Sequence, residues 1–170
     1  VVLTSLLIAY LIIIFLLHMI FPERHLDWHS INLDDITFPN EFTWGVATAS
    51  HQIEGGNSNN WTQFEERENK EHSGLACDHW NLWKKDHELL TELGVNSYRF
   101  SIEWSRIEPN QGEWNEAAIQ VYSDMIDSLI AKGIEPMVTL HHFSHPIWFE
   151  EKGGFYNREN IVHFKNYCTK

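Results

Sequence analysis

Cationic side chains are scarce in this 170-residue chain, which has 12 Lys and Arg against 24 Asp and Glu, a formal net charge of −12 with neutral histidines. A protein that binds a phosphate backbone needs a cationic surface. The composition therefore argues against nucleic acid as a partner. The length allows roughly one domain, at about 100–200 residues per domain.

Cysteine and nucleotide-binding glycine motifs are also nearly absent. The two cysteines, Cys77 and Cys168, lie far apart and match neither a disulfide framework nor the spacing of a zinc site. The pair Gly55-Gly56 lacks the G-x-G-x-x-G spacing of a dinucleotide site, and no Walker A sequence occurs. The sequence predicts no cofactor and no metal site.

Charge is missing altogether from residues 1–21, which contain no Asp, Glu, Lys or Arg. As a helix this segment spans about 31 Å, close to the roughly 30 Å of a bilayer core. The first interpretation is a transmembrane helix that inserts the protein into a membrane through a single N-terminal span. The alternatives are a cleaved secretory signal, although no basic stretch precedes the segment, or a buried helix. In those cases the protein is secreted or cytoplasmic.

Residues 22–37 are polar and are interpreted as a connector to a globular domain at 38–170. Three strands are expected in that domain, at 43–50, 96–104 and 136–143. The second alternates between apolar and polar side chains, which places its polar residues on one face.

Amphipathic helices are expected between these strands. One follows Asp78 as N-cap and ends at Gly94, a second follows Asn115 and ends near Gly133, and a third begins at Asn157. Strands that alternate with helices form parallel sheets. The polar face of the second strand favours a (β/α)8 barrel over an open doubly wound sheet, whose central strands are apolar on both faces.

Three separated motifs carry a family resemblance. The segments FPNEFTWGVATASHQIEGG, ACDHWNLWKKDHELLTELGVNSYRFSIEWSRIEPNQGEWN and KGIEPMVTLHHFSHPIWFEEKGGFYNREN resemble, in this order and spacing, the first third of family 1 glycoside hydrolases. That family is the β-glucosidase and β-galactosidase group. The resemblance implies a (β/α)8 TIM barrel, truncated here to about its first three βα units. It also implies hydrolysis of a small-molecule β-glycoside with retention of configuration.

The resemblance further implies roles for four residues. Gln52 and His142 hydrogen-bond sugar hydroxyls, Phe143 borders the same subsite where Trp is usual, and Arg99 lies beside the nucleophile and keeps it ionised. These roles suit the chemistry, because amides and imidazoles both donate and accept hydrogen bonds and an arginine lowers the pKa of a nearby carboxyl. The structural alternatives are a loop-capping Gln52, a core His142, and an Arg99 paired with Glu103.

No catalytic residue is assigned within the chain. Glu54, Glu103, Glu108 and Glu113 are declined, because the resemblance places the acid/base in an N-E-P sequence and the nucleophile in an E-N-G sequence, and neither occurs here. Retaining hydrolysis needs two carboxyls about 5–5.5 Å apart. The chain is therefore expected to be an incomplete N-terminal part of an enzyme and inactive alone. A sugar-binding or receptor-like pseudoenzyme is the alternative.

Overall fold

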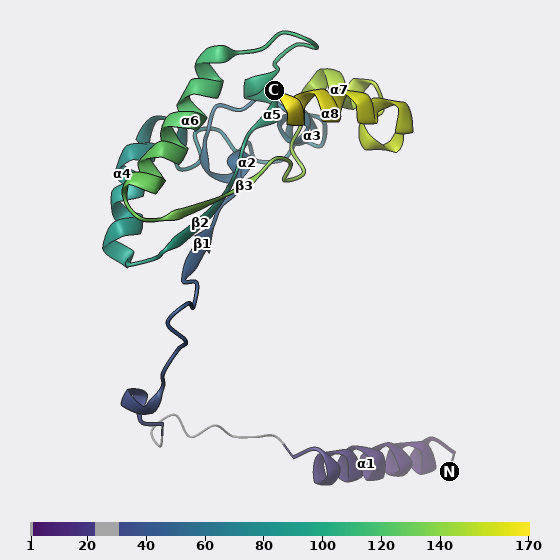
Figure 1. Ribbon diagram of the computed structural model, residues 1–170. Coiled ribbons are helices and arrows are strands. Elements are labelled where there is room, and N and C mark those ends of the chain that lie inside the picture. The colour runs from purple at the N-terminus through teal and green to yellow at the C-terminus, as the bar shows by residue number, and fades with distance from the viewer. Residues whose placement is uncertain (1, 23–30) are drawn as a thin grey trace. The chain divides into compact units, whose positions relative to one another are not determined.

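The computed structural model describes residues 2–22 and 31–170 (Figure 1). The chain divides into two compact units, Val1–Phe42 and Thr43–Lys170. Each unit is described by itself below.

The first unit contains helix α1 (Val2–Ile20) and the short 3-10 helix η2 (Leu33–Asp35). Helix α1 has 19 residues, so it is about 28 Å long, shorter than the span expected for residues 1–21. Within the described ranges no helix is both long and apolar enough to cross a membrane. The predictions of a transmembrane helix and of a membrane location are therefore wrong. Residues 23–30, half of the predicted connector, lie outside the described residues.

The second unit is built on a parallel sheet of strands β1 (Gly45–Ala47), β2 (Ser97–Ser101) and β3 (Glu135–Thr139), in the order β1-β2-β3. The register pairs Val46 with Tyr98 and Tyr98 with Pro136. The predicted alternation of parallel strands and helices is thus observed. Each strand is shorter than its sequence pattern, because the chain leaves the sheet and turns into a loop soon after the paired segment.

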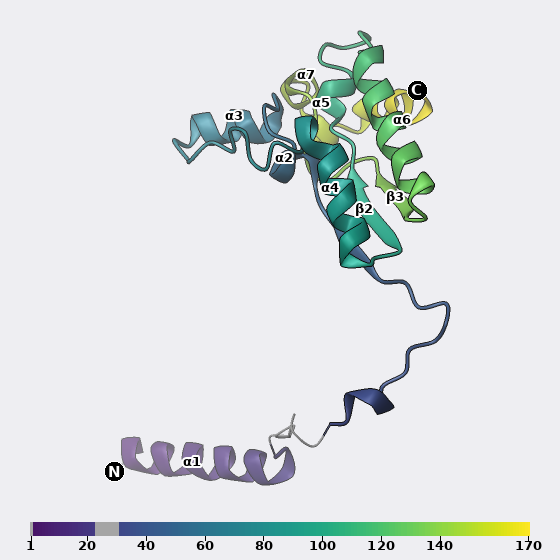
Figure 2. The same cartoon turned by 90° about the vertical axis from the view of Figure 1, so that its left-hand side faces the viewer.

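Long helices connect and follow the strands: α4 (His79–Leu93), α6 (Glu116–Ala131) and α8 (Ile161–Thr169). Helices α4 and α6 pack against each other beside the sheet (Figures 1 and 2). The Asn115 side chain caps α6 by accepting from the Ala118 N–H, and Gly94 ends α4 in the left-handed conformation, as expected. Asp78 has φ 54 and its side chain does not cap α4; it accepts from Asn81 instead.

The loops carry short helices that the sequence patterns did not indicate. These are α2 (Ser50–Ile53), α3 (Asn60–Arg67), α5 (Trp104–Ile107), α7 (Ile147–Glu151), η3 (Gly154–Tyr156) and η4 (Arg158–Asn160). All of them follow the carboxyl ends of strands, where they gather above the sheet (Figure 1). The third long helix consequently begins at Ile161, after η4, rather than at Asn157.

An apolar core joins the sheet to its covering helices. Trp104 is 0% exposed and stacks on Tyr167 of α8, with ring centroids 4.8 Å apart. Phe149 of α7 lies 4.7 Å from the same indole. The core also holds Tyr98, Phe100, Ile107, Ala118, Tyr122, Met125, Leu129 and Ile134. These contacts fix the loop helices α5 and α7 relative to the strand ends.

Candidate functional site

The loops that follow the three strands meet at the carboxylate of Glu103. This residue lies directly before α5 and is 0% exposed. Its Oε2 atom accepts hydrogen bonds from the hydroxyls of Ser50, at the start of α2, at 3.0 Å, and of Ser144, after β3, at 2.9 Å. Its Oε1 atom accepts from the Ser105 hydroxyl at 2.9 Å. One carboxylate therefore joins the loops after β1, β2 and β3.

Glu54, at the end of α2, is a second buried carboxylate. It accepts from the Tyr122 hydroxyl at 2.7 Å and from Arg106 Nε at 2.8 Å, and the Arg106 guanidinium lies 4.2 Å from the centroid of the Trp80 ring. Burial raises the pKa of Glu54 to about 7, against the opposing effects of Tyr122 and Arg106. The Tyr122 hydroxyl also accepts from the Glu103 N–H at 3.0 Å, so the two carboxylates belong to one network.

The residues predicted to contact sugar lie next to the two serines of this network. Gln52, two positions after Ser50, is exposed, and His142, two positions before Ser144, is half-buried. The side chain of Phe143 is 68% exposed, and its ring lies 5.3 Å from that of His142. The structure thus brings the loops of Gln52 and His142 to the same end of the sheet. Their contacts with a sugar stay a prediction.

The backbone of Phe143 is in the left-handed region, with φ 67, which is uncommon for a residue with a side chain. Its carbonyl accepts from Asn60 Nδ2 at 3.1 Å and from Trp61 Nε1 at 3.0 Å. Asn60 also accepts from the His145 N–H at 2.9 Å. Helix α3 therefore holds the loop after β3 in this strained form, as is common at functional sites.

Arg99 lies in β2 between the buried residues Tyr98 and Phe100, and its own side chain is exposed. The alternative in which Arg99 pairs with Glu103 is wrong, because serine hydroxyls occupy that carboxylate. Arg99 forms no salt bridge in the part of the chain that the structure describes. Its guanidinium is accordingly open to a carboxylate.

Two histidines and a glutamate stabilise the start of α7. The rings of His141 and His145 stack with centroids 5.7 Å apart, and His145 Nε2 lies 2.7 Å from Glu150 Oε2. Burial, followed by the neighbouring His145, lowers the pKa of His141 to about 4. Among the residues with described positions, no three such side chains are arranged to hold a metal ion.

No sequence pattern indicates the serines that surround Glu103. Ser50, Ser101, Ser105 and Ser144 are all buried, but single serines form no periodic pattern. The one available clue was Glu103 itself, a charged residue at the end of a strand whose other face is apolar. From the sequence, an ion pair with Arg99 is the structural alternative for Glu103, whereas the structure shows a hydroxyl cluster.

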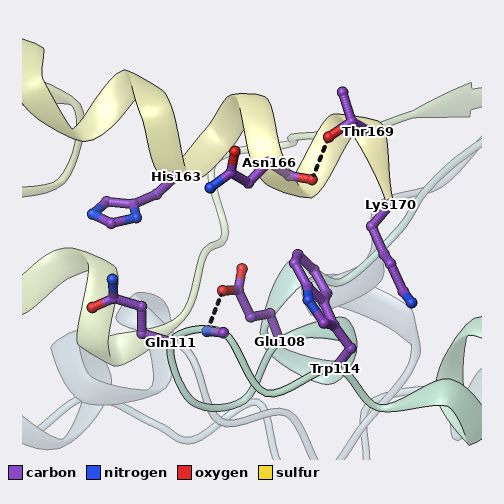
Figure 3. A pocket seen from close by; sticks show the side chains of 8 residues that line it. Glu108, Gln111, Trp114, His163, Asn166, Thr169 and Lys170 are labelled. Carbon is purple, nitrogen blue, oxygen red and sulfur yellow. Dashed lines mark hydrogen bonds between the residues drawn. The ribbon is translucent and has the colours of Figure 1, made fainter.

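A separate pocket, of about 390 Å³, opens between the loop after α5 and helix α8 (Figure 3). In Figure 3 the Glu108 carboxylate accepts from the Gly112 N–H, and the Trp114 ring stands beside Lys170. The pocket is lined by Glu108, Gln111, Gly112, Trp114, His163, Asn166, Thr169 and Lys170. It includes none of the predicted sugar-contacting residues, so it is distinct from the site at the strand ends.

Comparison with known families settles the relationship of the chain. The profile of glycosyl hydrolase family 1 matches residues 34–170. The chain belongs to this family. Beta-glucosidase A of Thermotoga maritima is 43% identical over 141 residues, which cover 76% of this chain and 32% of the relative. Beta-glucosidase 42 of Arabidopsis thaliana is 42% identical over 144 residues, which cover 77% of this chain and 29% of the relative.

Solved structures of the family agree in fold. The β-glycosidase from Pyrococcus horikoshii has 49% identity and a TM-score of 0.73, over 76% of this chain and 31% of that one. The family 1 glucosidase from Thermotoga maritima gives 42% identity and a TM-score of 0.72. This family 1 chain therefore spans about a third of the length of the curated relatives it matches.

Proposed function

We propose that this chain forms the N-terminal part of a retaining β-glycosidase on a (β/α)8 barrel, which hydrolyses the O-glycosidic bond of β-glucosides or β-galactosides. The observation that carries the proposal is the shared oxygen of Glu103, which accepts from both Ser50 and Ser144. It holds the loops of Gln52 and His142 at the carboxyl ends of parallel strands, where barrel enzymes build their active sites.

Each predicted residue has chemistry that suits a sugar. The exposed Gln52 amide offers a donor and an acceptor to neighbouring hydroxyls, and the half-buried His142 imidazole does the same. The exposed ring of Phe143 offers an apolar surface to the C–H face of a pyranose. Arg99, without a salt bridge among the described residues, is available to keep a nucleophilic carboxylate ionised.

The carboxyls within this chain are not suited to the chemical step. Glu54, Glu103 and Glu108 are 2%, 0% and 4% exposed and already accept hydrogen bonds from protein groups. Glu113, on the surface, accepts from Asn110. Neither N-E-P nor E-N-G occurs in the sequence. The 170 residues by themselves are therefore expected to hydrolyse no glycoside, because retention needs a nucleophile and a separate proton donor.

A hybrid enzyme tests this proposal. Residues 43–170 replace the matched segment of the Thermotoga maritima relative, and turnover of an aryl β-glucoside is measured alongside that of the 170-residue chain. The hybrid should be active and the chain alone inactive. Gln52→Ala and His142→Ala should each lower kcat/KM of the hybrid by about 100-fold, as expected when polar groups that bind the transition state are lost.

Glu113→Gln is the matched control, since it changes a surface carboxyl outside the proposed site and should leave kcat/KM unchanged. A hybrid that melts cooperatively but neither turns over nor binds glycosides would overturn the proposal. Binding of glucose without turnover would instead indicate the sugar-binding pseudoenzyme. Wild-type rates for the His142→Ala hybrid would remove that residue from the site.

A further inference from the structure

We infer that Glu103 is a positioning residue, a buried carboxylate that sets the placement of Gln52 relative to His142 through Ser50 and Ser144. The inference rests on the proposed function, because it assigns Glu103 an effect on sugar binding without contact with the sugar.

The hydrogen bonds around Glu103 link separate loops. Ser50 belongs to the loop after β1 and Ser144 to the loop after β3, and both donate to the same atom, Glu103 Oε2, at 3.0 and 2.9 Å. Ser105 donates to the other oxygen at 2.9 Å but lies in the same loop as Glu103. Only the Ser50 and Ser144 bonds therefore fix one loop relative to another.

The direction of the donated protons requires an acceptor at the position of the Glu103 side chain. A hydroxyl has one proton to donate, and Ser50 gives its proton to Glu103. The Ser50 oxygen then accepts from the Ser101 hydroxyl at 3.0 Å, and the Ser101 oxygen accepts from the Ser50 N–H at 2.7 Å. The chain of donors ends on the carboxylate, which accepts at both of its oxygens, whereas an amide in its place would offer one acceptor oxygen.

The carboxylate is itself held in place. The Glu103 N–H donates to the Tyr122 hydroxyl at 3.0 Å, which ties its backbone to helix α6. Glu103, Ser50 and Ser144 are 0%, 2% and 2% exposed, so water does not compete for these bonds. Charge-assisted hydrogen bonds in a buried site are about twice as strong as neutral ones.

Ser50 and Ser144 lie close enough in the chain to Gln52 and His142 that a shift of either serine would move the neighbouring side chain. Gln52 follows Ser50 within the single turn of α2, and His142 precedes Ser144 by two residues. Two polar groups that bind one sugar ring must both lie at hydrogen-bond distance. A misplacement of about 1 Å can cost roughly 100-fold in rate. Loss of a tie to Glu103 should therefore weaken sugar binding although no sugar contact is removed.

A purely structural role would predict a different result, and Ser105 provides the matched control. Ser144→Ala and Ser105→Ala each remove one hydroxyl bond of 2.9 Å to Glu103 from a buried site. Both should lower the melting temperature of the hybrid by similar amounts. Of the two variants, only Ser144→Ala removes a bond between Glu103 and the loop that carries His142, which α3 still holds through Asn60 and Trp61.

The experiment measures KM, kcat and amide hydrogen exchange in the active hybrid and its variants. Ser144→Ala should raise KM for the aryl β-glucoside by about 10-fold, and Ser105→Ala should change it by less than about 2-fold. Ser144→Thr keeps the hydroxyl and should restore KM. Amide exchange should accelerate at residues 141–145 in Ser144→Ala and be unchanged there in Ser105→Ala.

Equal effects of Ser144→Ala and Ser105→Ala on KM, or equal exchange at residues 141–145, would overturn the inference while leaving an active hybrid and the proposed function intact. A hybrid that melts cooperatively but neither turns over nor binds glycosides would instead overturn the proposed function. The two failures are therefore told apart, because the first is read from the serine variants and the second from the unsubstituted hybrid.

Discussion

Two buried glutamates in neighbouring loops are stabilised in different ways. Glu54 accepts from a cation, Arg106, and from one phenol, Tyr122, whereas Glu103 accepts from three serine hydroxyls. The first arrangement joins α2 to α5 and α6 and faces the core. The second joins the strand ends at the proposed site. A carboxylate surrounded by neutral donors can hold several loops together without a buried counterion beside a substrate.

The largest loss of stability is expected when the positive charge of Arg106 is removed. Arg106→Met leaves the Glu54 carboxylate, 2% exposed, without its positive partner, and breaking a buried pair in this way costs about 3–5 kcal/mol. Urea unfolding of the hybrid should show that loss. The double variant Arg106→Met, Glu54→Gln should recover part of it, and no recovery would mean that Arg106 acts mainly through packing on Trp80.

A smaller loss of stability is expected when the hydroxyl of Tyr122, which joins the Glu54 and Glu103 networks, is removed. Its hydroxyl donates to Glu54 and accepts from the Glu103 N–H, while burial and Glu54 raise its pKa well above the usual value, so the proton stays on the phenol. Tyr122→Phe should lower the free energy of unfolding by about 1–3 kcal/mol. An unchanged unfolding curve would show that the two carboxylates are held independently.

A more gradual effect is a pH dependence that separates Glu54 from its neighbour. Its pKa rises on folding from 4.5 to about 7, so the folded chain binds this proton more tightly than the unfolded chain. The contribution to stability is complete below pH 4.5 and is lost as the pH rises through about 7. At about 1.4 kcal/mol per pKa unit, the full loss is on the order of 3 kcal/mol.

Comparison of the hybrid with its Glu54→Gln variant isolates this contribution, because the histidines titrate alike in both. The difference in unfolding free energy between the two should change with pH over the interval between the two pKa values. A difference that is constant with pH would contradict the raised pKa of Glu54.

Local patterns predicted the framework of the second unit well. The helix cap at Asn115, the helix end at Gly94 and the parallel order of the strands all depend on neighbouring residues, and all are confirmed. The short-range rule failed at the start of α4. Asp78 begins its helix in a left-handed conformation that no pattern indicated.

The candidate site was only partly accessible from the sequence. The roles of Gln52 and His142 came from motifs, but the tie between their loops depends on serines far apart in the chain that meet at Glu103. The membrane prediction failed because it used hydropathy and segment length alone. Neither quantity reports where the helix ends.

The left-handed backbone of Phe143 limits which residues can replace it. Since its φ is 67, a β-branched residue such as Val or Ile would be strongly disfavoured there whatever its affinity for a ligand. Aromatic and unbranched side chains, with a single substituent on Cβ beyond the backbone, are less restricted. The main-chain conformation at position 143 thus restricts which residues are tolerated at the edge of the proposed sugar site, independently of the substrate.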